Sequence, residues 1–147
     1  MEKHLQESYP DHKILITTGT VTSAHMMGSS LNGATIHQFI PIDNYLSMWL
    51  FFKHWKPKIG ILIECELWPN LLYLGSKNCN IILANARMSD RSFAKWKKYK
   101  FAIQPLLKCL KAILCQSETD YKKYIELGAD NAIIANNRQT KFLIDVF

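Results

Sequence analysis

Residues 59–70 read IGILIECELWPN, and this stretch decides the fold class. Its five leading residues predict a very apolar strand over Ile59–Ile63, of the kind found in a parallel sheet covered by helices. Two acids, Glu64 and Glu66, follow directly, and a helix is expected to begin near Trp68 or Pro69. A buried strand that runs through a polar loop into a helix is the repeating unit of α/β proteins.

The same alternation continues on both sides of this stretch. The other predicted strands are Lys13–Thr18, Ala34–Phe39, Ile81–Asn85, Ala112–Cys115 and Ala132–Ile134. Stretches of helical period fill the gaps, which predicts an α/β fold, a Rossmann-like parallel sheet with helices on both faces. The 147 residues suit one domain, residues 1–147.

Local signals set the expected ends of the helices. Asp43 and Asn44 can cap a helix whose apolar residues recur at steps of three and four until Pro57 stops it. A second helical pattern follows Arg91, and Pro105 is expected to kink or restart it.

Ser117 and Asp120 resemble a capping box, and Gly128 is a natural left-handed stop. They predict a well-delimited helix over residues 118–127.

Charge is unevenly distributed along the chain. The net charge is +6, and the whole excess of Lys and Arg lies in residues 86–147. Six lysines and no acid lie between Lys95 and Lys111, a pattern that attracts anionic lipid surfaces or phosphorylated ligands, although a solvated helix face is the default interpretation. No RNA- or DNA-binding motif accompanies the charge, so we expect no nucleic-acid partner.

Cysteine spacing and hydropathy narrow the class of protein further. The four cysteines show no CxxC spacing and no neighbouring His pair, so we expect no metal site, no cofactor and a reducing compartment. No apolar run is long enough to span a bilayer, and the start, MEKHLQESYPDHK, lacks a signal-peptide core. These features predict a cytoplasmic location.

Ligands bind parallel sheets at the carboxyl ends of the strands, which directs attention to three loops. The first is TTGTVTS, residues 17–23, in which Thr18 and Thr20 offer hydroxyls and a helix start offers backbone donors to an anion. Turns rich in Gly and Thr also serve simply as helix caps.

The second loop, ECELWPN, places Glu64 and Glu66 at a strand end. A carboxylate there can bind sugar hydroxyls, orient a basic partner or act as a general base, and Glu66 is the candidate catalytic residue. The alternative is that Glu66 caps the helix that follows.

The third loop, ANARMSDRS, residues 84–92, gathers donors on Asn85, Arg87, Ser89 and Arg91. Arginine forks suit phosphate or carboxylate. The alternative is a helix start capped by Ser89 or Asp90, with the arginines paired to the two glutamates of the second loop.

In this order and spacing, the three loops resemble the transferases of 3-deoxy-D-manno-octulosonic acid (Kdo), glycosyltransferases of lipopolysaccharide assembly. The most specific strings are ELWPN and ANARMSDRS. A later part of the family pattern is matched by Gln116, Asp120 and Leu127 with Gly128. The resemblance extends from about Tyr9 to about Asn136.

The resemblance implies one half of a GT-B fold, in which an N-terminal domain takes a lipid A precursor and a C-terminal domain takes CMP-Kdo. It makes Thr18, Thr20, Glu64, Glu66, Asn85, Arg87, Ser89 and Arg91 candidates for the acceptor site. The apolar helix after Asn44 and the lysine-rich segment could then lie against the cytoplasmic face of the inner membrane.

The departures from the family pattern are also informative. The family's membrane-anchoring helix and the Gly-Glu loop with its general base have no match here, and NNRQTKFLIDVF, residues 136–147, departs from the family's passage into the nucleotide-sugar domain. We therefore expect an incomplete acceptor-side domain that is inactive alone. The alternatives are a subunit completed by a second chain and a noncatalytic module that binds anionic lipid.

Overall fold

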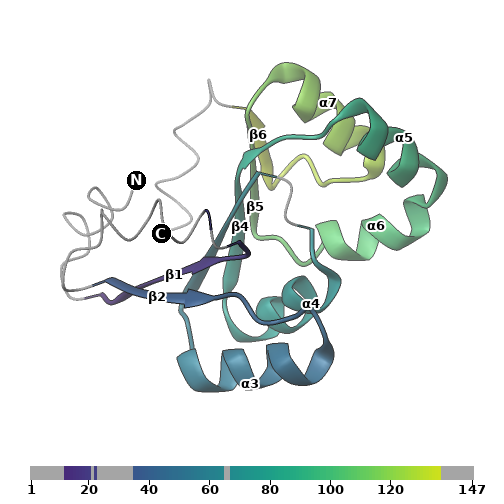
Figure 1. Ribbon diagram of the computed structural model, residues 1–147. Helices are drawn as coiled ribbons and strands as arrows, with labels where there is room; N and C mark the ends of the chain where they lie inside the picture. The colour runs from purple at the N-terminus through teal and green to yellow at the C-terminus, as the bar shows by residue number, and fades with distance from the viewer. Residues whose placement is uncertain (1–11, 21, 23–34, 65–66, 137–147) are drawn as a thin grey trace. The chain divides into compact units, whose positions relative to one another are not determined.

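The computed structural model describes residues 12–20, 22, 35–64 and 67–136 (Figure 1). The chain divides into two compact units, residues 1–42 and 43–147, each with its own parallel sheet. The first sheet pairs β1 (Ile14–Thr18) with β2 (Thr35–Phe39), in register from Ile14 beside Thr35 to Thr18 beside Phe39.

The second unit contains a four-stranded parallel sheet in the order β3-β4-β5-β6. Its strands are β3 (Ile59–Ile63), β4 (Asn80–Ala86), β5 (Ala112–Cys115) and β6 (Ile134–Asn136). Its helices are α3 (Tyr45–Trp55), α4 (Pro69–Asn78), α5 (Asp90–Lys98), α6 (Lys100–Leu107) and α7 (Glu118–Leu127). Parallel sheets with intervening helices confirm the predicted α/β class.

The core of the second unit lies between one face of its sheet and three helices. Sheet residues with alternating spacing, such as Leu83 and Ile113, pack with Leu72 of α4, Ile103 of α6 and Leu127 of α7. Figure 1 shows α3 lying alongside α4, and α5, α6 and α7 grouped together. Helix α3 packs against α4 through Phe52, since a Cβ added at Gly75 of α4 would lie 2.9 Å from the Phe52 ring.

The helix ends follow the predicted signals. Asn44 caps α3 by accepting from the Ser47 N–H at 2.8 Å, and the helix closes with Lys56 in the left-handed conformation, just before Pro57. Gly128 closes α7 with φ of 104°. Short polar caps and a left-handed terminal residue satisfy backbone groups that a helix leaves unpaired.

Two predicted boundaries are wrong. The helical pattern after Arg91 breaks at Tyr99, while Pro105 lies inside α6, so the proline is not the point of restart. The carbonyl four residues before Pro105 is that of Phe101, which lies inside α6, so the proline does not cause the break at Tyr99. The last strand is β6 rather than Ala132–Ile134, because Asp130 accepts from the Ala132 N–H at 2.9 Å and holds the preceding residues in a turn.

The remaining strand predictions agree to within a residue. Ile59–Ile63 and Ala112–Cys115 are confirmed as predicted, and β4 extends the predicted Ile81–Asn85 by one residue at each end. Of the predicted Lys13–Thr18, Lys13 stays outside β1, and Ala34, the start of the next predicted strand, lies outside the described residues.

Candidate functional site

The first part of the site is the carboxyl end of β3. Glu64 follows the strand, its side chain is exposed, and its N–H donates to the Ala84 carbonyl at 3.1 Å. Its φ is 68°, a left-handed conformation that non-glycine residues seldom adopt and that is found preferentially at functional sites. Glu66, the candidate base, lies outside the described residues.

The neighbouring strand β4 has a second left-handed residue one position before its end. Asn85 has φ of 52°, and the register between β4 and β5 shifts between Leu83 and Ala86. This irregularity turns Ala86 and then Met88 toward the core, whereas Asn85 and Arg87 are exposed. Ile63 pairs with Ala84, so the polar residues that follow each strand come to the same edge of the sheet.

Helix α7 holds this loop at Met88 from two sides. The Met88 N–H donates to Asp120 Oδ1 at 2.8 Å, and Lys123 Nζ donates to the Met88 carbonyl at 2.7 Å. Asp120 is only 7% exposed and also accepts from the Ser117 hydroxyl at 2.5 Å. These bonds fix the backbone between Arg87 and Ser89.

The loop ends in the first turn of α5. Ser89 is its N-cap, and its hydroxyl oxygen accepts from the Ser92 N–H at 3.2 Å. Lys123 reaches Asp90 at 2.7 Å, and this hydrogen bond with its charge lowers the pKa of the Asp90 carboxyl. The helix-start interpretation therefore holds for Ser89.

The two arginines of the loop point to solvent. Arg87 and Arg91 are exposed, and neither makes a hydrogen bond or ion pair to another residue within the described ranges. The predicted alternative, a pairing of these arginines with Glu64, is therefore not seen, and any pairing with Glu66 falls outside those ranges.

The threonine loop belongs to the first unit. Thr18 ends β1, its hydroxyl lies 3.0 Å from His37 Nε2, and Thr20 is exposed. Glu64 and Asn85 thus lie at the carboxyl ends of the paired strands β3 and β4, and Arg87, Ser89 and Arg91 follow in the loop and first turn of α5 of the same unit. Thr18 and Thr20 belong to the first unit.

One residue that the sequence analysis assigned to α3 acts elsewhere. The Asp43 carboxylate accepts from the Asn70 N–H at 3.2 Å and the Leu71 N–H at 2.8 Å, so it caps α4 rather than α3. The amide of Asn70 also donates to the Asp43 carbonyl at 2.9 Å. Helix α3 and strand β3 lie between Asp43 and α4 in the sequence, so local spacing could not reveal this role of Asp43. The start of α4 at Pro69-Asn70, by contrast, could be predicted from the sequence.

The lysines of α5 and the start of α6 form an exposed basic surface. Lys95, Lys98 and Lys100 are exposed, and Lys97 pairs with Glu126 at 2.5 Å. Phe93 and Trp96, on the other side of α5, pack against the core. The segment is therefore a solvated helix face with positive charge.

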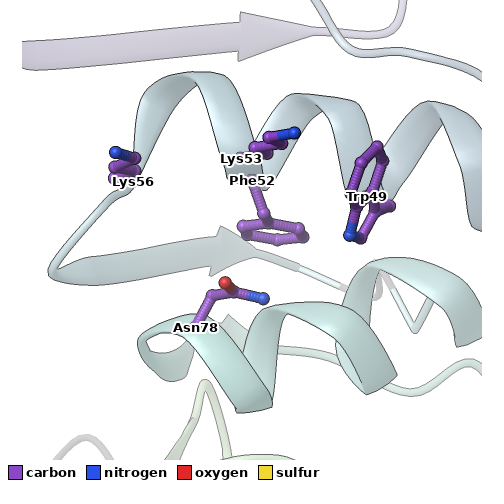
Figure 2. A pocket seen from close by; sticks show the side chains of 5 residues that line it. All are labelled: Trp49, Phe52, Lys53, Lys56 and Asn78. Atoms are coloured by element: carbon purple, nitrogen blue, oxygen red, sulfur yellow. The ribbon is translucent and has the colours of Figure 1, made fainter.

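An open pocket of about 410 Å³ lies between the last turns of α3 and α4 (Figure 2). Trp49, Phe52, Lys53 and Lys56 line it from the α3 side, and Asn78 lines it from α4. These helix ends lead into the amino ends of β3 and β4, so the pocket is at the opposite edge of the sheet from Glu64 and Asn85. It is not part of the candidate site.

No metal-binding group of three His, Cys, Asp or Glu residues occurs in the part of the chain that the structure describes. Nor does that part contain a helix whose length and apolar character would allow it to cross a membrane. Burial raises the pKa of the Cys79 thiol to about 11 and that of Cys115 to about 12, so neither provides a thiolate at neutral pH.

Residues 1–144 match the family described as "3-Deoxy-D-manno-octulosonic-acid transferase (kdotransferase)". The chain belongs to the Kdo transferase family. A Kdo transferase of Rickettsia felis is 42% identical over 134 residues, which are 91% of this chain and 29% of the relative. One from Haemophilus influenzae is 33% identical over 127 residues, 86% of this chain and 30% of the relative. The chain thus spans less than a third of the length of these Kdo transferases.

Proposed function

We propose that this chain forms the acceptor side of a Kdo transferase and binds a phosphorylated lipid A precursor at the carboxyl edge of β3 and β4. The observation that carries the proposal is the pair of exposed arginines, Arg87 and Arg91, on a loop fixed by α7. Arginine forks bind phosphate oxygens in pairs, and a fixed backbone lowers the entropy cost of aligning them.

The neighbouring residues suit the sugar part of the acceptor. Glu64 and Asn85 supply a carboxylate and an amide for sugar hydroxyls, and Ser89 positions the loop as a cap. The left-handed conformations of Glu64 and Asn85 support this assignment, because backbone strain of about 1–3 kcal/mol for each persists where the surrounding structure compensates for it.

Transfer of Kdo requires a base for the acceptor hydroxyl and stabilisation of the departing phosphate. The family's Gly-Glu loop with its general base has no match in this sequence, so Glu66 is the candidate base that this chain itself offers. Glu66 follows Glu64 on the same loop, and it is not needed as a cap of α4 because the Asn70 and Leu71 N–H groups already donate to Asp43. Thr18 and Thr20 would add hydroxyls. CMP-Kdo would bind a second, nucleotide-sugar domain, as in a GT-B pair, with residues 1–147 acting as the acceptor-side domain.

The test is binding of the tetra-acylated lipid A precursor in detergent micelles to the purified chain. Each charge-assisted hydrogen bond contributes about 1.5–3 kcal/mol, so Arg87→Ala should weaken binding about 10- to 100-fold. Lys122→Ala removes an exposed lysine of α7 and is the matched control. Equal affinity of Arg87→Ala and Lys122→Ala, or undiminished binding of a dephosphorylated precursor, would contradict the proposal.

A second candidate function is attachment to an anionic membrane surface through α3. Tyr45, Leu46, Trp49 and Leu50 are exposed apolar side chains of α3, next to the buried Met48 and Phe52. Lys53 Nζ lies 4.6 Å from the Trp49 ring centroid. Aromatic and aliphatic side chains edged by lysine suit the boundary between headgroups and acyl chains.

Liposome flotation tests this second candidate. Leu50→Glu should reduce flotation with anionic vesicles, whereas Ser76→Glu, an exposed change on α4, should have little effect. Binding of the micellar precursor through Arg87 should not need Leu50. Flotation that is reduced by neither substitution would count against a role for α3.

A further inference from the structure

Asp90 is an isolated acid in a basic part of the chain. Residues 67–117 contain no other Asp or Glu, and Asp90 lies between the two arginines of the candidate acceptor loop, Arg87 and Arg91. It is the first residue of α5, where a negative charge stabilises the partial positive charge of a helix N-terminus. The same charge opposes the proposed function, because a carboxylate repels a phosphate and competes for the arginines that would bind it.

Lys123 of α7 holds the Asp90 carboxylate. Lys123 Nζ lies 2.7 Å from Asp90 Oδ1 and donates to the Met88 carbonyl, also at 2.7 Å. The Lys123 side chain is only 15% exposed, whereas that of Asp90 is 96% exposed, so the lysine is the fixed member of the pair and the carboxylate turns toward it. Within the described part of the chain, Asp90 pairs with Lys123 and with neither flanking arginine.

We propose that Lys123 is a positioning residue of the acceptor loop, which keeps the Asp90 carboxylate against α7 and prevents it from pairing with Arg87 or Arg91. The Lys123–Asp90 pair carries no net charge, so the acid can stabilise the start of α5 without cancelling the positive charge of the arginines. For ligand binding, this role rests on the proposed function, whereas the position of the Asp90 carboxylate does not.

A purely structural role is the competing explanation, since Lys123 also ties α7 to the Met88 carbonyl. A second ion pair between the same two helices provides a matched control, because Lys97 of α5 lies 2.5 Å from Glu126 of α7. Lys97→Met removes one positive charge and one α5–α7 ion pair, as Lys123→Met does, but it does not touch the acceptor loop. Asp90→Asn separates the two explanations, because it removes the carboxylate charge and cannot replace the lost bond to Met88.

The first measurement follows the side-chain Nε–H signals of Arg87 and Arg91 by nitrogen-15 NMR, on the chain without ligand. Asp90→Asn should leave these signals nearly unchanged when Lys123 is present. It should shift them when Lys123 is replaced by Met, since only then does the carboxylate reach the arginines. Equal shifts in the two backgrounds would overturn the proposal. A Lys97→Met background should give the result of the unaltered chain.

The second measurement is the affinity for the tetra-acylated lipid A precursor in micelles. Lys123→Met should weaken binding about five- to tenfold, because the released carboxylate repels phosphate and pairs with an arginine, whereas Lys97→Met should cost no more than about twofold. The double variant Lys123→Met/Asp90→Asn should recover most of the loss, which a misfolded chain could not do. A double variant that binds as weakly as Lys123→Met would refute the positioning of charge.

Failure of the proposed function would look different. In that case the precursor would not bind, or its affinity would be the same for every variant, Arg87→Ala included. The NMR comparison would still decide whether Lys123 controls the Asp90 carboxylate, because it needs no ligand.

Discussion

Replacing Asp120 by alanine removes the carboxylate that holds the candidate acceptor loop on α7. The carboxylate accepts from the buried Met88 N–H at 2.8 Å and from the Ser117 hydroxyl. A hydrogen bond to a charged group contributes about 1.5–3 kcal/mol, and a buried donor left unpaired costs about 1–3 kcal/mol. Since Ser117 keeps its own cap on the helix, we expect a loss of about 3 kcal/mol, a large part of the stability of a domain.

Equilibrium urea unfolding, followed by circular dichroism, measures this loss. Asp130→Ala is the matched control, because the Asp130 side chain is exposed and accepts one hydrogen bond, from the Ala132 N–H at 2.9 Å. Its expected cost is about 0.5–1 kcal/mol. Hydrogen exchange gives a local readout, since the Met88 amide should exchange faster only in Asp120→Ala. Equal costs for the two variants, with Met88 exchange unchanged, would refute the reasoning.

Two substitutions and one labelling experiment test other parts of the structure. Glu64→Gly should stabilise the chain by about 1 kcal/mol in urea unfolding, because φ of 68° is unfavourable for a residue with a Cβ; no gain would show that the conformation is unstrained. Gly75→Ala should lower stability by about 1–3 kcal/mol in thermal unfolding, because its Cβ would overlap Ile81 Cδ1 and lie 2.9 Å from Phe52 Cζ; increased stability would contradict this packing. Burial raises the pKa of the Cys115 thiol from 9.0 to about 12, so the protonated thiol favours the folded state below pH 9 and this stabilisation is lost as the pH rises toward 12. Iodoacetamide should label Cys115 slowly in buffer and fast in urea, and equal rates would disprove this.

The parts of the fold that the sequence predicted well are those with local causes. Ile59–Ile63 and Ala112–Cys115 are uninterrupted apolar runs bounded by polar residues, so their ends coincide with the strand ends. The break at Tyr99 was not predictable in the same way, because the apolar period continues across it and the visible signal, Pro105, lies further along the chain. The turn before β6 depends on one side-chain bond of Asp130.

The same distinction between local and long-range causes applies to the candidate site. The residues that follow β3 and β4 were predicted because the carboxyl ends of parallel strands share an edge. The residues that support them were not, because their partners are distant in sequence. Asp43 caps a helix that begins more than twenty residues later, and Asp120, expected only as part of a capping box, also binds Met88. Spacing alone does not reveal such long-range bonds.

The two bonds at Met88 also have a mechanical consequence. Asp120 and Lys123 are about one turn apart on α7, and they form hydrogen bonds with the N–H and the carbonyl of Met88, respectively. The loop is therefore carried by the helix as a rigid attachment, and a displacement of α7 would shift Arg87 by a similar amount. A ligand or an engineered contact on the outer surface of α7, far from Arg87, would then change the position of Arg87.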